Sequence, residues 1–163
     1  MSLGDDKSGI LKAGTPAPAF ELKDLGGAAR TLESLLQHGP VLLAFFKVSC
    51  PVCQLTFPFL ERLSKSEAVQ VVGVSQDDAQ ATRAFNERFG VTFPVLLDAS
   101  SAGYAVSNAY RISSVPTIFM IERDGAISNS FEGFSKRGLG GIGERIHVAP
   151  FLAGEFVPEF KAG

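Results

Sequence analysis

Apolar residues in this chain of 163 residues gather in short runs, and two of these runs have the length of a strand. Residues 41–46 read Val-Leu-Leu-Ala-Phe-Phe without a polar interruption, and residues 69–74 form a second, nearly continuous run. Runs of this kind are typical of central strands that helices bury on both faces. They predict the middle of a sheet.

The segments that follow these two runs have helical spacing. After Pro51, the residues Leu55, Phe59 and Leu63 lie four apart on one side, and Pro58 predicts a kink in that helix. A second helix carries apolar positions 81, 85 and 89 and ends at a glycine at position 90. We expect Asp77, with a glutamine three residues later, to cap this second helix.

The remaining pattern completes an α/β fold. It predicts a hairpin of residues 19–22 and 28–31, a strand at 94–97, a helix with small residues from 102 to 109, a hairpin of 117–121 and 126–131, and a glycine-rich last helix around 139–148. Strands that alternate with helices indicate a central sheet with right-handed crossovers and helices on both faces. Residues 1–13 are polar and unpatterned, so we expect a loose leader followed by one domain over residues 14–163.

Charge and hydropathy narrow the choice of partners. The formal net charge of -2 and the pI near 5.7 leave no basic excess, so nucleic acid and anionic membranes are not expected as partners. No apolar run approaches the roughly 20 residues of a membrane helix, and the first residues lack a secretion pattern. We expect a soluble chain, cytoplasmic as given or exported if a leader was removed, with its compartment and oligomeric state left open.

The two cysteines of the chain, Cys50 and Cys53, lie two residues apart. A disulfide across so short a loop restricts the unfolded chain little, so the pair indicates chemistry rather than a structural staple. Cys50 stands where the first buried strand meets a helix, with Pro51 at the first helical position. As the helix N-cap it would be favoured as a thiolate, the nucleophile in disulfide exchange, while Cys53 one turn later would resolve the mixed disulfide.

Other uses of the cysteine pair fit the sequence less well. A zinc site needs about four ligands, and only His38 and His147 could add to the cysteines, at no finger-like spacing. Haem attachment requires a histidine directly after the second cysteine, where Gln54 stands. Two inert buried thiols stay an alternative, although a helix start is a poor place to bury a thiol.

Three short motifs resemble the thioredoxin superfamily, and the likeness spans roughly residues 14–148. The run Cys50-Pro51-Val52-Cys53 with Pro58 resembles the active-site helix, Ser114-Val115-Pro116-Thr117 the loop with a cis-proline, and Phe131-Glu132-Gly133-Phe134 the segment whose glycine borders the substrate groove. Residues 14–20 and the extra strand and helix between residues 74 and 117 are similar to the redoxin branch. That branch holds membrane-linked thioredoxins and peroxidases of the alkyl hydroperoxide reductase and thiol-specific antioxidant type.

The resemblance implies a thioredoxin-like fold with a mixed central sheet, an N-terminal hairpin and a strand-helix insertion. It implies a cis bond before Pro116 and assigns substrate binding to Pro51, Val52, Val115, Pro116 and Gly133. Both the redoxin activities that it suggests need a thiol electron donor and no bound cofactor or metal.

This sequence departs from the family at four positions. Ala44 stands in place of thioredoxin's buried aspartate, Ser49 in place of its tryptophan, and Thr56 in place of the glutamate of cytochrome-maturation relatives. The group that deprotonates Cys53 is therefore left open. Lys47 occupies the position of the peroxidase threonine; its ammonium would stabilise the Cys50 thiolate or simply lie in water.

Three functions follow from these motifs. The first is a thiol-disulfide oxidoreductase that acts on protein disulfides or dithiols, with Cys50 attacking and Cys53 resolving. The second is a thiol peroxidase in which Cys50 is oxidised to sulfenic acid and condenses with Cys53. The third is a redox-sensing or binding module that does not turn over. The direction of exchange depends on a reduction potential that the sequence does not reveal.

Two further patterns have ordinary interpretations. Residues 138–143 fit GxGxxG, but too little chain follows for a dinucleotide-binding βαβ unit, so we expect only a loosened helix. Phe151, Phe156 and Phe160 either pack on the domain or mark a partner surface.

Overall fold

The computed structural model describes residues 9–163 of the chain. In order, its elements are β1 (Glu21–Asp24), β2 (Ala29–Thr31), α1 (Leu32–Leu36), β3 (Val41–Phe46), α2 (Pro51–Leu63), β4 (Gln70–Ser75), α3 (Ala79–Phe89), β5 (Val95–Leu97), a 3-10 turn η1 (Ser100–Ala102), α4 (Ala105–Ala109), β6 (Thr117–Ile121), β7 (Ile127–Glu132), β8 (Phe134–Ser135), α5 (Lys136–Ile146) and β9 (Phe160–Lys161).

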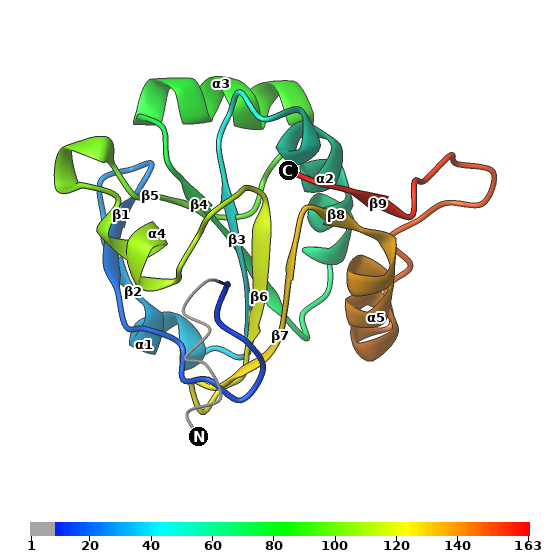
Figure 1. Cartoon of the computed structure of the whole chain (residues 1–163), viewed down its shortest axis with the longest axis horizontal. Helices are drawn as coiled ribbons and strands as arrows, with labels where there is room; N and C mark the ends of the chain where they lie inside the picture. Colours follow the sequence, from blue (N-terminus) through cyan, green and yellow to red (C-terminus); the bar gives the residue numbers. More distant parts are fainter. Residues whose placement is uncertain (1–8) are drawn as a thin grey trace.

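Seven of these strands form one mixed sheet, in the order β2-β1-β5-β4-β3-β6-β7 (Figure 1). β3 pairs in parallel with β4 and antiparallel with β6, and every one of its residues is buried. The bounds of β3 are those predicted from the run at residues 41–46. The mixed α/β sheet and both predicted hairpins, β1–β2 and β6–β7, are confirmed.

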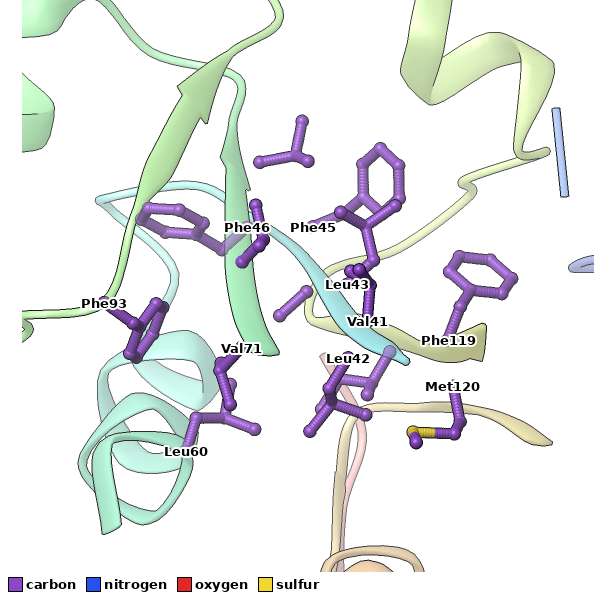
Figure 2. Close-up of a cluster of buried hydrophobic side chains, with 14 of the residues drawn as sticks. Val41, Leu42, Leu43, Phe45, Phe46, Leu60, Val71, Phe93, Phe119 and Met120 are labelled. Carbon is purple, nitrogen blue, oxygen red and sulfur yellow. The ribbon is translucent and has the colours of Figure 1, made fainter. Parts of the chain in front are cut away.

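Helices cover both faces of the sheet. Neighbouring residues of a strand point to opposite faces, so Phe45 and Phe46 of β3 contact different helices. Phe46 packs against Phe57 of α2 at 4.2 Å between ring centroids and against Phe85 of α3 at 4.9 Å. Phe45 packs on the other face, against Tyr110 at the end of α4, at 5.2 Å. Figure 2 shows this division, with Phe93 on one side of β3 and Phe119 on the other.

The predicted helix over residues 102–109 is wrong in its length. The chain forms η1, turns at Gly103 and Tyr104 with φ of 67° and 53°, and restarts as the five-residue α4. The buried carboxylate of Asp98 accepts hydrogen bonds from the backbone amides of Ser107 at 2.7 Å and Val106 at 3.3 Å. These bonds satisfy amides in the first turn of α4, so a separate short helix forms there.

The predicted capping residue of α3 is also wrong. Asp78, not Asp77, is the N-cap, and its side chain accepts a hydrogen bond from the amide of Ala81 at 2.8 Å. Asp77 accepts instead from the amide of Val48, 29 residues earlier in the chain, at 2.8 Å. Asp77, which the local pattern predicts as the cap of α3, therefore accepts a tertiary hydrogen bond instead.

The segments before β1 and after β8 differ from their predicted extents. Residues 1–8 of the expected leader lie outside the described residues, but Leu11, also placed in that leader, is buried, and Ser130 donates a hydrogen bond to its carbonyl. The last helix begins at Lys136, earlier than expected, and contains the glycine pattern of residues 138–143. Within residues 9–163, no helix has the length and apolar character that crossing a membrane requires.

Candidate active site

Cys50 is the N-cap of α2, as the sequence predicts. Pro51 occupies the first helical position, and the backbone amide of Cys53 donates a hydrogen bond of 3.3 Å to the sulfur of Cys50. The amides of a first helical turn have no partner within the helix, so a sulfur at this position accepts one of them. The same bond, with the positive end of the helix dipole, stabilises negative charge on the Cys50 sulfur.

Cys53 lies in a different environment, although it is only one turn away. Its side chain is fully buried, whereas Cys50 is partly exposed. Burial raises the pKa of the Cys53 thiol strongly, and the hydrogen bond of this thiol to Cys50 and the negative charge of Asp77 raise it further. The backbone amide of Lys47 opposes that shift. The pair therefore consists of one accessible sulfur and one that holds its proton.

The segment around Val115 lies directly beside the first cysteine. The Cys50 thiol donates a hydrogen bond of 3.4 Å to the carbonyl oxygen of Val115, and the Val115–Pro116 bond is cis, as expected. The amide of Gly133 donates to the carbonyl of Pro116 at 2.8 Å, which continues the β6–β7 ladder by one step. The fold thus brings Val115, Pro116 and Gly133 together at Cys50.

The other predicted site residues lie around the start of α2. Pro51 is exposed and Val52 is half-buried, both within the first turn beside Cys50. Lys47 follows β3 with an exposed side chain, and its carbonyl accepts a hydrogen bond from the amide of Cys50 at 3.2 Å. A role for its ammonium at the thiolate stays a prediction.

Asp77 is the site residue that sequence reasoning missed. Its carboxylate holds the amide of Val48 in the loop before Cys50, and its charge acts on the buried thiol of Cys53. The two positions where relatives carry an acid offer none: Ala44 is buried in β3, and the hydroxyl of Thr56 donates to a carbonyl of its own helix, that of Val52, at 2.7 Å. The adjacent pair Asp77-Asp78 was the available signal, since only one of the two can cap α3.

The two histidines lie in other parts of the fold than the cysteines. His38 is exposed in the loop between α1 and β3, and His147 ends α5 with a φ of 60°. In the part of the chain from residue 9 onward, no group of three or more His, Cys, Asp and Glu side chains is arranged to hold a metal ion.

Comparison with known proteins gives one family match and related oxidoreductases. Residues 13–130 match the AhpC/TSA family. The chain is 32% identical over 127 residues to the thiol-disulfide oxidoreductase ResA of Geobacillus kaustophilus, an alignment that covers 76% of this chain and 71% of that protein.

Solved structures share the fold. A secreted Mycobacterium tuberculosis disulfide oxidoreductase, described as homologous to E. coli DsbE, superposes with a TM-score of 0.64 at 26% identity, over 77% of this chain and 95% of that one. Peroxidoxin BcpB of M. tuberculosis superposes with a TM-score of 0.67 at 24% identity, over 83% and 94% of the two chains. At that identity the second likeness concerns the fold alone.

Proposed function

This chain belongs to the AhpC/TSA family and is a thiol-disulfide oxidoreductase, and we propose that Cys50 attacks a protein disulfide while Cys53 resolves the product. One observation carries the proposal. The Cys50 sulfur sits at the open end of α2 with the Cys53 amide donating to it, whereas the Cys53 thiol is buried behind it. An accessible sulfur whose negative charge is stabilised is suited to attack a substrate disulfide. A buried, protonated thiol is suited to react only after the mixed disulfide has formed.

The exchange balances in two steps. The Cys50 thiolate attacks one sulfur of the substrate disulfide, so a bond forms between Cys50 and that sulfur while the substrate bond breaks and its other sulfur leaves as a thiolate. Cys53 then loses its proton and attacks the Cys50 sulfur. The Cys50–Cys53 disulfide forms and the second substrate sulfur leaves. The substrate gains two electrons and two protons, and the protein dithiol loses them.

The same steps run in reverse when the oxidised protein meets a dithiol. A reducing cycle requires a thiol or dithiol donor to return the Cys50–Cys53 disulfide to its reduced state, and an oxidising cycle requires a disulfide acceptor. The difference between the reduction potential of the pair and that of its partners decides the direction. The substrates we propose are protein disulfides or protein dithiols.

Substrate binding is assigned to the residues around the first cysteine. Pro51 and Val52 lie in the first turn of α2, and Val115, Pro116 and Gly133 form an edge of backbone beside the Cys50 sulfur. A strand edge of this kind recognises an extended polypeptide by main-chain hydrogen bonds. We therefore propose that the segment on either side of the substrate cysteine binds there in an extended conformation.

The peroxidase alternative has less support. The relative with 32% identity is named a thiol-disulfide oxidoreductase, whereas the likeness to peroxidoxin BcpB concerns the fold. Lys47 also occupies the position where peroxidases of this branch carry a threonine.

Trapping of mixed disulfides tests the proposal. With a Cys53→Ser variant, we expect covalent complexes between Cys50 and a protein such as oxidised insulin, because the resolving thiol is gone while the attacking one remains. A Cys50→Ser variant is the matched control and should trap almost none. If hydrogen peroxide oxidised Cys50 of the wild type orders of magnitude faster than an ordinary thiolate, and insulin were left unreduced, the peroxidase alternative would replace this assignment.

A further inference from the structure

The surface assigned to the substrate is covered in this structure. Val115, Pro116 and Gly133 are all buried, although they lie beside a partly exposed cysteine. The chain itself provides the cover. Strand β9 pairs antiparallel with β8, with Lys161 opposite Phe134, and Figure 1 shows the chain end that follows β9 next to α2.

The chain end makes backbone contact with the same groups that a substrate would use. A Cβ added to Gly163 would overlap the carbonyl group of Val115 and would lie 3.3 Å from the nitrogen of Pro116. The Cys50 thiol donates its hydrogen bond to that same carbonyl oxygen of Val115. Gly163 and the Cys50 thiol therefore both lie against the same carbonyl group.

A second close approach lies one step away, at Gly133. A Cβ added to this residue would overlap the carbonyl oxygen of Lys161 and would lie 3.4 Å from the Cα of Ala162. No side chain separates the two backbones here. Strand β9 at residues 160–161 is extended, and the chain from Lys161 to Gly163 passes close to Gly133 and Val115.

The cover is anchored upstream of β9. Phe151 packs against Phe59 of α2 at 5.3 Å and against Phe134 at 6.5 Å. Arg62 of α2 donates to both carboxylate oxygens of Glu155, at 2.7 and 2.8 Å. The guanidinium lowers the pKa of Glu155 to about 2 through these hydrogen bonds, so the pair is ionised throughout the neutral range.

Residues 159–163, which cover the active site, make weaker contacts with the domain than Phe151 and Glu155 do. β9 has two residues, and the Phe160 side chain is 58% exposed. Backbone bonding to β8 and Lys136, and an ion pair of 3.5 Å between Lys136 and the mostly exposed Glu159, hold it in place. Short strands and exposed ion pairs of this kind contribute little. The contacts that hold residues 159–161 are separate from those that hold Phe151 and Glu155.

We propose that residues 159–163 are an intramolecular pseudosubstrate that occupies the edge formed by Val115, Pro116 and Gly133 and must leave before a protein substrate binds. This inference rests on the proposed function and adds a level of control to it. An extended polypeptide competes with the segment for the same backbone groups. A small disulfide needs only the sulfur of Cys50, which is partly exposed with the segment in place. The segment therefore selects against polypeptides and not against disulfides in general.

The size of the effect follows from the fraction of molecules in which the edge is free. If the segment is off the edge in about a tenth of the molecules, a polypeptide binds about 10-fold more weakly than to an open edge. A substrate that does not use the edge is unaffected by this equilibrium. Rates with a polypeptide disulfide therefore report whether the edge is free, and rates with a small disulfide report the reactivity of the Cys50 sulfur.

Two variants open the edge in different ways. Gly163→Val keeps the full chain and every anchor but places a side chain where the Val115 carbonyl lies. A chain that ends at Pro158 lacks β9 and keeps Phe151 and Glu155. Phe156→Ser is the matched control, because this tail residue is 90% exposed and lies outside β9. Each protein is reduced, and its single-turnover rates with insulin and with hydroxyethyl disulfide are measured.

We expect Gly163→Val and the shortened chain to reduce insulin about 10-fold faster than the full chain, with rates toward hydroxyethyl disulfide within about twofold of it. Phe156→Ser should match the full chain in both assays. Insulin rates that stay the same or fall in both edge-opening variants would overturn the proposal, as would an equal gain with both substrates. If no protein reacted with either disulfide, the proposed function itself would fail, and this inference with it.

Discussion

The backbone amide of Cys53 donates a hydrogen bond to the sulfur of Cys50 across 3.3 Å, so one cysteine of the pair supports the sulfur of the other. The bond arises because Cys50 is the N-cap of α2 and Cys53 is its third helical residue, the spacing at which a capping side chain accepts an amide. The Cys53 thiol is buried, whereas the Cys50 sulfur is partly exposed.

The two thiols should differ widely in reactivity. We expect Cys50, measured in a Cys53→Ser variant, to react with iodoacetamide at neutral pH at least about 10-fold faster than Cys53 in a Cys50→Ser variant. The cause is that burial keeps the reagent from Cys53 and raises the pKa of its thiol. Equal rates would contradict the assigned roles. In the same assay, slower alkylation of Cys50 in a Lys47→Met background would show that the Lys47 ammonium stabilises the thiolate. An unchanged alkylation rate would show that the ammonium lies in water without acting on Cys50.

Removal of the Asp77 charge should make Cys53 easier to ionise. In a Cys50→Ser background, Asp77→Asn should lower the pKa of Cys53 and speed its alkylation about threefold, corresponding to about half a pKa unit. The asparagine still offers an oxygen to the amide of Val48, so the loop before Cys50 should keep its position. The pH dependence of the alkylation rate measures the shift.

A matched variant separates the charge of Asp77 from its hydrogen bond. Asp77→Leu removes the acceptor as well, and the half-buried Val48 amide then lacks a partner, which should cost about 1–3 kcal/mol in the free energy of unfolding. Asp78→Asn keeps a good N-cap for α3 and should leave Cys53 unchanged. If Asp77→Asn and Asp78→Asn changed the pKa of Cys53 equally, the charge of Asp77 would not act on the buried thiol more strongly than that of its neighbour.

The raised pKa of Cys53 makes stability depend on pH in the alkaline range. Below the unfolded value, near 8.5, both states hold the proton and the full stability is present. Above it the unfolded chain loses the proton while the native thiol keeps it, so the free energy of unfolding of the reduced protein should fall, by up to about 1.4 kcal/mol per pH unit. Denaturant unfolding at pH 7 and pH 9.5 measures this fall.

A Cys53→Ala variant is the reference for that measurement. Tyr110, whose pKa is also raised by burial, adds a similar loss above about pH 10, and it does so in both proteins. The wild type should therefore lose more stability than the variant between pH 7 and 9.5. Parallel pH profiles of the two proteins would contradict a buried, protonated Cys53.

Local sequence alone determined the core strand and the position of Cys50 at a helix start. The run at residues 41–46 is apolar at every position, so only a strand covered on both faces buries it, and β3 has those bounds. Cys50-Pro51, shortly after this run, specified a helix start because proline fits the first helical position and a thiol before it can accept an amide hydrogen bond. Both signals act between residues near in sequence.

The tertiary structure decided the role of Asp77 and the cover over the substrate edge. Asp77 and Asp78 are equivalent as local caps, and only the approach of Val48, from a loop 29 residues away, separates them. Residues 160–161 have no periodic pattern that predicts a strand; they pair with β8 because Phe151 and Glu155 bind α2 and direct the chain there. Contacts between distant segments depend on the packed fold, and this is why the sequence predicted the two cysteines but not the segment that covers Val115 and Gly133 beside them.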